Sequence, residues 1–188
     1  NEGWHVLSVD LRATGATTNK SDSIRRAPDH NSAEWSLWTG RPLLGQWVYD
    51  VRRLLDALDE RRKLTPDLAL VAVGPASLVA LAAAANDPRI KQVATVGGLA
   101  SYVSDVPYEK QRLGIIVPGI LKRIGDVAHL AALTAPRRLV VAGSVTGGGA
   151  RLNAAALTKQ YEWTRAAFKY AGDSCLLYTS DAADEVVR

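Results

Sequence analysis

The sequence predicts an α/β fold with a mostly parallel sheet and helices on both faces. Short apolar runs alternate with helical patterns along the 188 residues, which is typical of βαβ units. Several of the short runs are apolar throughout, as in strands that are buried within a parallel sheet. Glycine or proline bounds most of these runs, and such residues mark the turns between elements.

The first half of the chain is expected to hold one strand and two helices before the central part of the sheet. A strand is predicted at residues 4–9, because this run is largely apolar and ends at Asp10. A charged loop follows over residues 19–31, and a short helical piece with two tryptophans covers residues 33–38. Residues 44–61 predict an amphipathic helix, because their aliphatic side chains recur on one helical face.

The second half continues the alternation. Residues 68–73 form an apolar run that Gly74-Pro75 ends, and the alanine-rich residues 77–85 predict a buried helix. Strands are expected at residues 92–96 and 138–142, adjacent and parallel to residues 68–73, with residues 4–9 beside them. A helix is predicted over residues 120–133 and a last amphipathic helix over residues 153–170.

Charge and composition argue against several classes of function. The net charge is +4, but the arginines occur in scattered pairs rather than in one basic stripe, so no nucleic acid partner is expected. No apolar run reaches the roughly 20 residues that span a bilayer, so no membrane partner is expected. The three histidines show no metal-ligand spacing, and neither glycine-rich turn has a phosphate-binding pattern. We therefore expect no metal and no cofactor.

The order of several short motifs resembles the α/β-hydrolase fold. Residues 9–15 read V-D-L-R-A-T-G, which is similar to the D-x-R-G-x-G segment of that fold with Ala13 at the first glycine. Gln46, Asp50 and the N-D-P-R-I run at residues 86–90 continue the likeness, which covers roughly residues 3–170 and most resembles bacterial acetyl xylan esterases. The resemblance implies a carbohydrate ester hydrolase that acts on acetylated polysaccharide, and it is compatible with an exported protein.

The residues that such a hydrolase needs are substituted here. The family places its nucleophilic serine on a tight strand-to-helix turn, written G-x-S-x-G. In Gly74-Pro75-Ala76-Ser77-Leu78 the third position is Ala76, which carries no nucleophile. Ser77 is expected to cap the helix, with a displaced nucleophile as the alternative, and its N–H takes the place of an oxyanion donor. The acid position falls on Thr146, which cannot stabilise an imidazolium, and the catalytic histidine is expected after residue 170, outside this chain.

Two hypotheses of function follow from these substitutions. One is a hydrolase whose catalytic residues depart from the usual pattern, and the other is a non-catalytic relative that binds a glycan or a protein partner. Trp35, Trp38 and Trp47 could line a sugar-binding cleft, although packing between helices is the simpler use for them. His129 is expected to be a packed or surface histidine, and the oligomeric state is not predicted.

The two ends of the chain predict a fragment. Residues 175–185 read C-L-L-Y-T-S-D-A-A-D-E, which resembles the in-frame translation of a sequencing adapter. We expect a partial α/β-hydrolase domain over residues 1–174, lacking its outer parts, and a non-native tail over residues 175–188 that packs against nothing specific. Leaving out the tail removes the single cysteine and leaves 22 of the 23 basic and 16 of the 19 acidic residues, so the net charge becomes +6.

Overall fold

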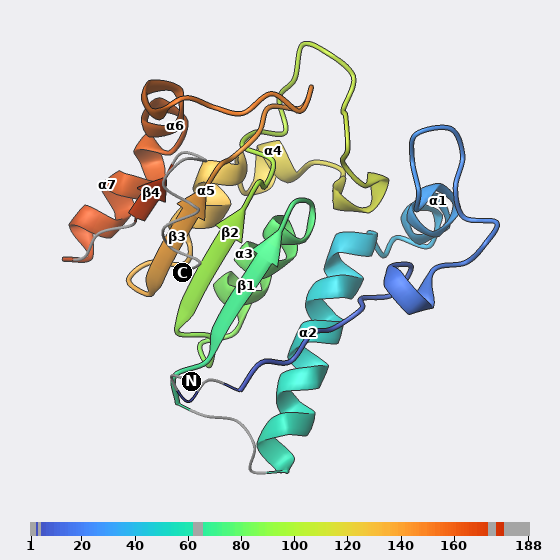
Figure 1. Ribbon diagram of the computed structural model, residues 1–188, viewed down its shortest axis with the longest axis horizontal. Coiled ribbons are helices and arrows are strands. Elements are labelled where there is room, and N and C mark those ends of the chain that lie inside the picture. Colours follow the sequence, from blue (N-terminus) through green and yellow to red (C-terminus); the bar gives the residue numbers. More distant parts are fainter. Residues whose placement is uncertain (1–2, 4, 62–65, 173–175, 179–188) are drawn as a thin grey trace.

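The fold is a four-stranded parallel sheet with its helices on one face (Figure 1). It is known from a computed structural model, which describes Gly3 and residues 5–61, 66–172 and 176–178. Two short 3-10 helices accompany the α-helices and strands. In chain order the elements are η1 (Gly15–Thr17), α1 (His30–Trp38), α2 (Leu43–Glu60), β1 (Ala69–Val73), α3 (Ala76–Asn86), β2 (Gln92–Val96), η2 (Leu113–Ile115), α4 (Ile120–Arg123), α5 (Val127–Ala132), β3 (Arg138–Ala142), α6 (Ala154–Gln160), α7 (Glu162–Tyr170) and β4 (Leu176–Tyr178).

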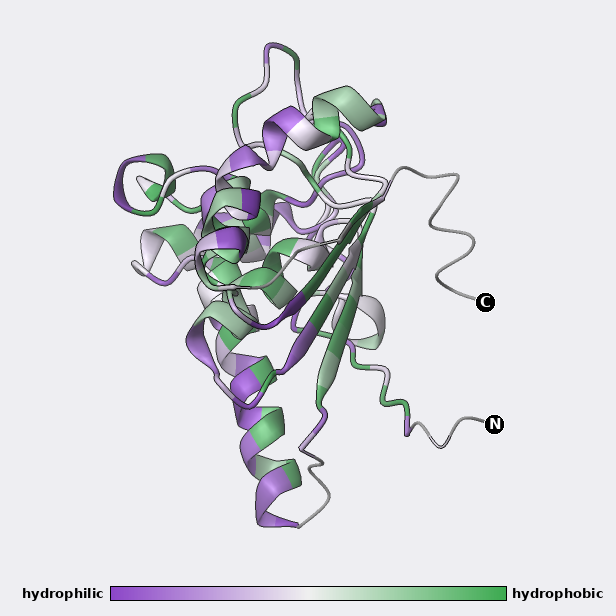
Figure 2. Ribbon diagram, turned by 90° about the vertical axis from the view of Figure 1, so that its left-hand side faces the viewer, coloured by the Kyte–Doolittle hydropathy of each residue, from purple (hydrophilic) through white to green (hydrophobic). Residues whose placement is uncertain are grey.

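The sheet confirms the parallel arrangement of three predicted strands. Its order is β1-β2-β3-β4, and all three pairs are parallel, so each connection crosses from one end of the sheet to the other. Because the strands follow chain order and such crossovers are right-handed, every connecting helix falls on the same side. Figure 2 shows the helices on one side of the strands. The expectation of helices on both faces is therefore wrong for the described residues.

Burial alternates along the strands in the way that a one-sided sheet requires. Leu70, Val93 and Leu139 are in register on the helix-covered face, where Val93 and Leu139 are at most 1% exposed. Val71 and Val73 point to the opposite face and are 72% and 67% exposed. The side chains of the apolar strand β1 thus alternate between the core and the exposed face of the sheet.

Helix α3 is the centre of the core. Residues 77–84 are all buried, because α3 lies between the sheet on one side and helices α2 and α5 on the other. Its small alanine side chains permit this close approach on all sides. Helix α2 packs on it through an amphipathic face, and the indole N–H of Trp47 on that face donates to the carbonyl of Arg12 at 2.7 Å.

Two of the predicted helices are each divided in two. Between α4 and α5 the backbone turns at Gly125, whose φ of +106° favours glycine, and the side chain of Asp126 caps α5. Between α6 and α7 the turn is at Tyr161, which is 2% exposed and lies with its hydroxyl 3.3 Å from the Ser144 hydroxyl. Burial raises the pKa of Tyr161 to about 12.

The predicted strand at residues 4–9 is wrong over its described part. Residues 5–10 pair with no described strand, and Val6 and Leu7 are 90% and 60% exposed. The chain is held instead at Arg12, whose guanidinium bonds Asp50 on α2, so the preceding residues run past the sheet edge. A strand needs a neighbour as well as a β-prone sequence.

The expectation that the tail packs against nothing specific is wrong for three residues. Residues 176–178 form β4, which pairs in parallel with β3, and Leu177 packs against the core. An unpaired strand edge accepts any β-prone segment that reaches it, and Leu-Leu-Tyr is such a segment. Cys175 and residues 179–188 lie outside the described residues. Among the described helices, none combines the length and the apolar character needed to cross a membrane.

Candidate functional site

Three glycine turns meet at the carboxyl edge of the sheet, where open α/β sheets usually bind their ligands. Gly74, Gly97 and Gly143 directly follow β1, β2 and β3, with φ values of +58°, +64° and +58°. Each donates its N–H at 2.8 Å to the last residue of the neighbouring strand before the chain turns away. Each strand thus ends in the same type of turn, and the turn after β1 is the one at which the sequence predicts the nucleophile position.

The apex of the turn after β1 is Gly74. In a nucleophile elbow the catalytic residue lies on a strained strand-to-helix turn. Gly74 has the positive φ at this turn, whereas Pro75 is already in a right-handed helical conformation and Ala76 is the first residue of α3. Ala76, the position singled out in the sequence, therefore lies two residues beyond the apex. Neither position carries a nucleophile.

Ser77 is a packed residue of α3. Its side chain is 2% exposed, and its hydroxyl donates to the Ala72 carbonyl over 3.4 Å. The prediction of a helix cap is wrong, because the hydroxyl accepts no N–H of the first turn. Its backbone N–H donates to the Gly74 carbonyl at 3.0 Å, so this donor is already used within the turn. Ser77 thus presents neither an accessible hydroxyl nor a free oxyanion donor.

Thr146 lies in an exposed loop beyond β3. Its N–H and its hydroxyl oxygen bond the carbonyl and the N–H of Ala150 at 2.8 and 3.2 Å, which closes a tight glycine-rich turn. These bonds are local, and the threonine hydroxyl carries no charge. Thr146 therefore stabilises its own loop and supplies no carboxylate at the sheet edge.

A polar network near α5 was not expected from the sequence. Asp126 accepts hydrogen bonds from the Ser101 hydroxyl and from the N–H groups of Tyr102 and Val127. His129 accepts the N–H of Asp126 at 3.1 Å, and its ring stacks on Trp163 with 5.7 Å between centroids. These bonds satisfy the first turn of α5 and join it to the loop after β2. His129, for which a packed or a surface position was expected, is half-buried and packs on Trp163.

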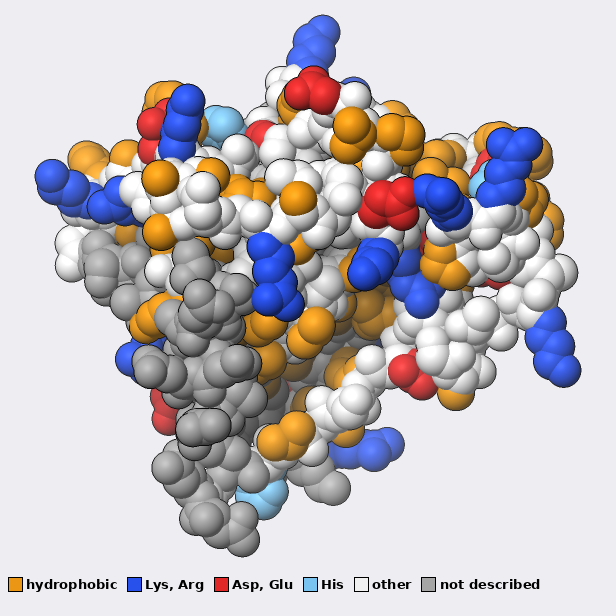
Figure 3. All heavy atoms as spheres, turned by 45° about the horizontal axis from the view of Figure 1, so that its top comes forward, with side chains coloured by type: hydrophobic (Ala, Val, Ile, Leu, Met, Phe, Trp, Pro, Cys, Tyr) orange, Lys and Arg blue, Asp and Glu red, His pale blue; other side chains and the backbone are white. Residues whose placement is uncertain are grey.

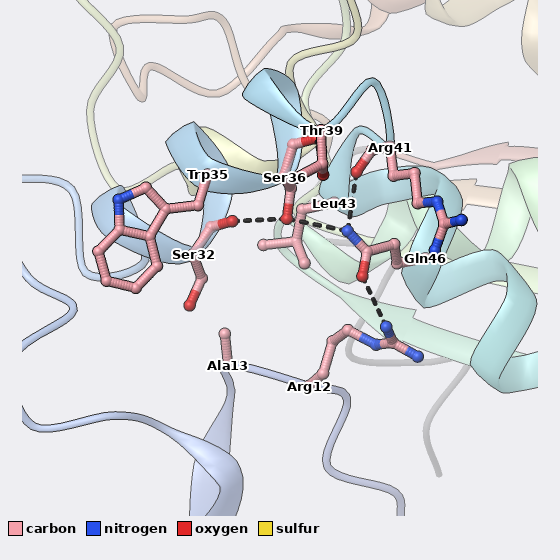
Figure 4. Close-up of a pocket in the computed structure, with 9 residues that line it drawn as sticks. All are labelled: Arg12, Ala13, Ser32, Trp35, Ser36, Thr39, Arg41, Leu43 and Gln46. Atoms are coloured by element: carbon pink, nitrogen blue, oxygen red, sulfur yellow. Dashed lines mark hydrogen bonds between the residues drawn. The ribbon is translucent and has the colours of Figure 1, made fainter.

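A pocket of about 580 Å³ lies between α1, the start of α2 and the loop before η1 (Figure 4). Arg12, Gln46 and Arg41 stand at one end of it, while Trp35 and Ser32 stand at the other. Its lining residues are Arg12, Ala13, Ser32, Trp35, Ser36, Thr39, Arg41, Leu43 and Gln46.

The polar end of the pocket joins two motifs that are far apart in sequence. The Arg12 guanidinium donates to both carboxylate oxygens of Asp50 and, at 2.6 Å, to the Gln46 side-chain carbonyl. The hydrogen bond with Asp50 raises the pKa of Arg12 above its ordinary value. Arg41 differs from Arg12, because no described carboxylate forms an ion pair with its guanidinium.

The three tryptophans of this region separate into two roles. Trp47 is 1% exposed and belongs to the core, as helix packing requires. Trp35 and Trp38 on α1 are 53% and 73% exposed, and Trp35 borders the pocket. Which of the three indoles face solvent could not be read from the sequence.

Among the described residues, no cluster of three or more His, Cys, Asp or Glu side chains could hold a metal ion. Comparison with known proteins found no match to a protein family, to a curated protein or to a solved structure.

Proposed function

We propose that this chain is a non-catalytic relative of the α/β-hydrolase carbohydrate esterases and that it binds a glycan. The relationship is supported by contacts between the resembling motifs. Arg12 of the first motif bonds Gln46 and Asp50 of the second, so segments that are more than thirty residues apart come together. Ala13, which stands at a glycine position of the first motif, has a φ of +58°. That value is one that glycine adopts readily and alanine rarely.

The observation that favours binding over hydrolysis is the packing at the turn after β1. The apex is a glycine, and the nearest hydroxyl, on Ser77, is 2% exposed and directed at a backbone carbonyl. Acyl transfer requires a nucleophile within reach of both a base and the substrate. A buried hydroxyl without a titratable partner meets neither condition.

The glycan is favoured by the exposed indole beside the pocket. The face of Trp35 is electron-rich, and the C–H groups of a pyranose ring carry partial positive charge, so the two surfaces are complementary. Side chains with hydroxyl, amide and guanidinium groups line the remainder of the pocket, as in sites that orient small polar ligands. Acetylated polysaccharide, the substrate class of the resembling esterases, is the glycan to test first.

Two measurements on the full chain test this function. We expect hydrolysis of p-nitrophenyl acetate at the buffer rate, both for the wild type and for Ser77→Ala, together with retarded migration in gels that contain acetylated xylan. Turnover that disappears in Ser77→Ala would establish Ser77 as a displaced nucleophile and would restore the hydrolase hypothesis. Unretarded migration in the polysaccharide gel would exclude the glycan.

A further inference from the structure

The pocket beside α1 contains one cation that no described carboxylate neutralises. Arg12 shares its charge with Asp50, but no described carboxylate pairs with the Arg41 guanidinium, and Arg41 is exposed. Figure 4 shows both guanidinium groups on the Gln46 side of the pocket and the Trp35 indole at the far end. Figure 3 shows that basic side chains are spread over this side of the molecule rather than gathered in one patch.

Most other polar side chains of the pocket already form internal hydrogen bonds. The Gln46 amide donates to the Ser36 hydroxyl at 2.9 Å and to the Arg41 carbonyl at 2.7 Å, while its oxygen accepts from Arg12. The Ser32 hydroxyl donates to Asp22 at 2.8 Å. The Arg41 side chain is thus the strong donor that remains for a ligand, and a guanidinium bonds a carboxylate best.

We infer that this pocket binds a uronic acid, a pyranose with a carboxylate, within an acidic glycan. The carboxylate would pair with Arg41, and a neighbouring sugar ring of the same glycan would lie against the face of Trp35 at the other end of the pocket. This inference rests on the proposed glycan binding and adds the charge and the location of the bound sugar.

The test compares two xylo-oligosaccharides of equal length, one with a glucuronic acid branch and one without, by isothermal titration calorimetry on the full chain. The wild type is expected to bind the acidic ligand about tenfold more tightly, the effect of one charge-assisted hydrogen bond. Arg41→Gln should lower affinity for the acidic ligand about tenfold and leave the neutral ligand within about twofold. Trp35→Ala should weaken both ligands by about tenfold.

Matched controls separate this site from the rest of the surface. Arg123→Gln removes an exposed arginine of α4, and Trp38→Ala removes an exposed indole of α1 that does not line the pocket. Both controls are expected to bind as the wild type does. Equal affinity of the wild type for the two ligands, or an unchanged preference in Arg41→Gln, would overturn the uronic acid site and leave glycan binding standing. Failure of the wild type to bind either ligand would overturn the proposed function itself.

Discussion

The packing of Ser77 predicts a specific loss of stability in Gly98→Ala. A Cβ atom at residue 98 would lie 2.6 Å from the Ser77 Cβ and 2.7 Å from its hydroxyl oxygen. Carbon atoms in contact are normally about 3.5–4.0 Å apart, so the substitution forces α3 or the turn after β2 to move. Overpacking of this kind costs about 2 kcal/mol of unfolding free energy. For a chain of this size the midpoint of thermal unfolding should fall by about 4–8 °C.

Second substitutions at residue 77 identify the cause of that loss. Ser77→Gly removes the Cβ with which the new methyl group collides, so the double variant should regain about 1 kcal/mol relative to additivity. Ser77→Ala retains the Cβ and should give little rescue. Gly45→Ala is the matched control: residue 45 is exposed in α2, its added Cβ meets nothing within 4 Å, and the change should raise stability by about 0.5 kcal/mol.

Circular dichroism during urea and thermal unfolding measures the wild type, the four single variants and the two double variants. A Gly98→Ala variant as stable as the wild type would mean that Ser77 is not held against residue 98. The buried, structural role of Ser77 would then be lost, and with it the main reason for regarding the turn as inactive. A destabilised Gly98→Ala variant without rescue by Ser77→Gly would place the clash elsewhere.

Two further predictions concern buried carboxylates. The side chain of Arg89 lowers the pKa of Asp87, which is 3% exposed, so Asp87→Asn should lower the free energy of unfolding by about 2 kcal/mol at neutral pH. A depressed pKa stabilises the fold above the unfolded value near 3.9, and this contribution is lost as pH falls through the folded value. The deficit measured by urea unfolding should therefore shrink below about pH 4, and a constant deficit would contradict the ion pair. Asp29 is fully buried and accepts two N–H groups of η2 at 2.9 Å each, so Asp29→Ala should lower the free energy of unfolding by about 3 kcal/mol. Asp105 is exposed, and Asp105→Ala should leave the free energy of unfolding almost unchanged. Equal stability of these two variants would exclude the role given to Asp29.

The sheet could be predicted where the signal was local. Strands β1, β2 and β3 are apolar runs bounded by proline and glycine, and their order follows from short right-handed crossovers. The strand expected at residues 4–9 failed because pairing depends on a neighbour that the local sequence does not reveal. The break at Gly125 carried a visible signal, whereas the break at Tyr161 did not, since an aromatic residue is common on the buried face of one continuous helix.

The sequence predicted a turn without a nucleophile, but not the position of the strained residue in that turn and not the pocket. The sequence located a strand-to-helix turn without a nucleophile, but the apex fell on Gly74 rather than Ala76, because only the backbone dihedral angles locate the strained residue. The pocket could not be predicted at all. It forms where Arg12 meets Gln46, and nothing local to either residue indicates their contact across 34 positions.

The turn after β1 keeps its geometry without a nucleophile. A residue with a side chain at a strained φ costs about 1–3 kcal/mol, and an active hydrolase tolerates this cost because its nucleophile must project from the turn. Glycine adopts the same φ of +58° without a Cβ, so Gly74 keeps the path from β1 into α3 with less strain. The space beside the turn is filled by Ser77 against Gly98, which is core packing rather than a cleft. In the proposed glycan binding, recognition depends on side chains that are not needed for packing. The exposed indole of Trp35 and the unpaired guanidinium of Arg41 are such groups among the described residues.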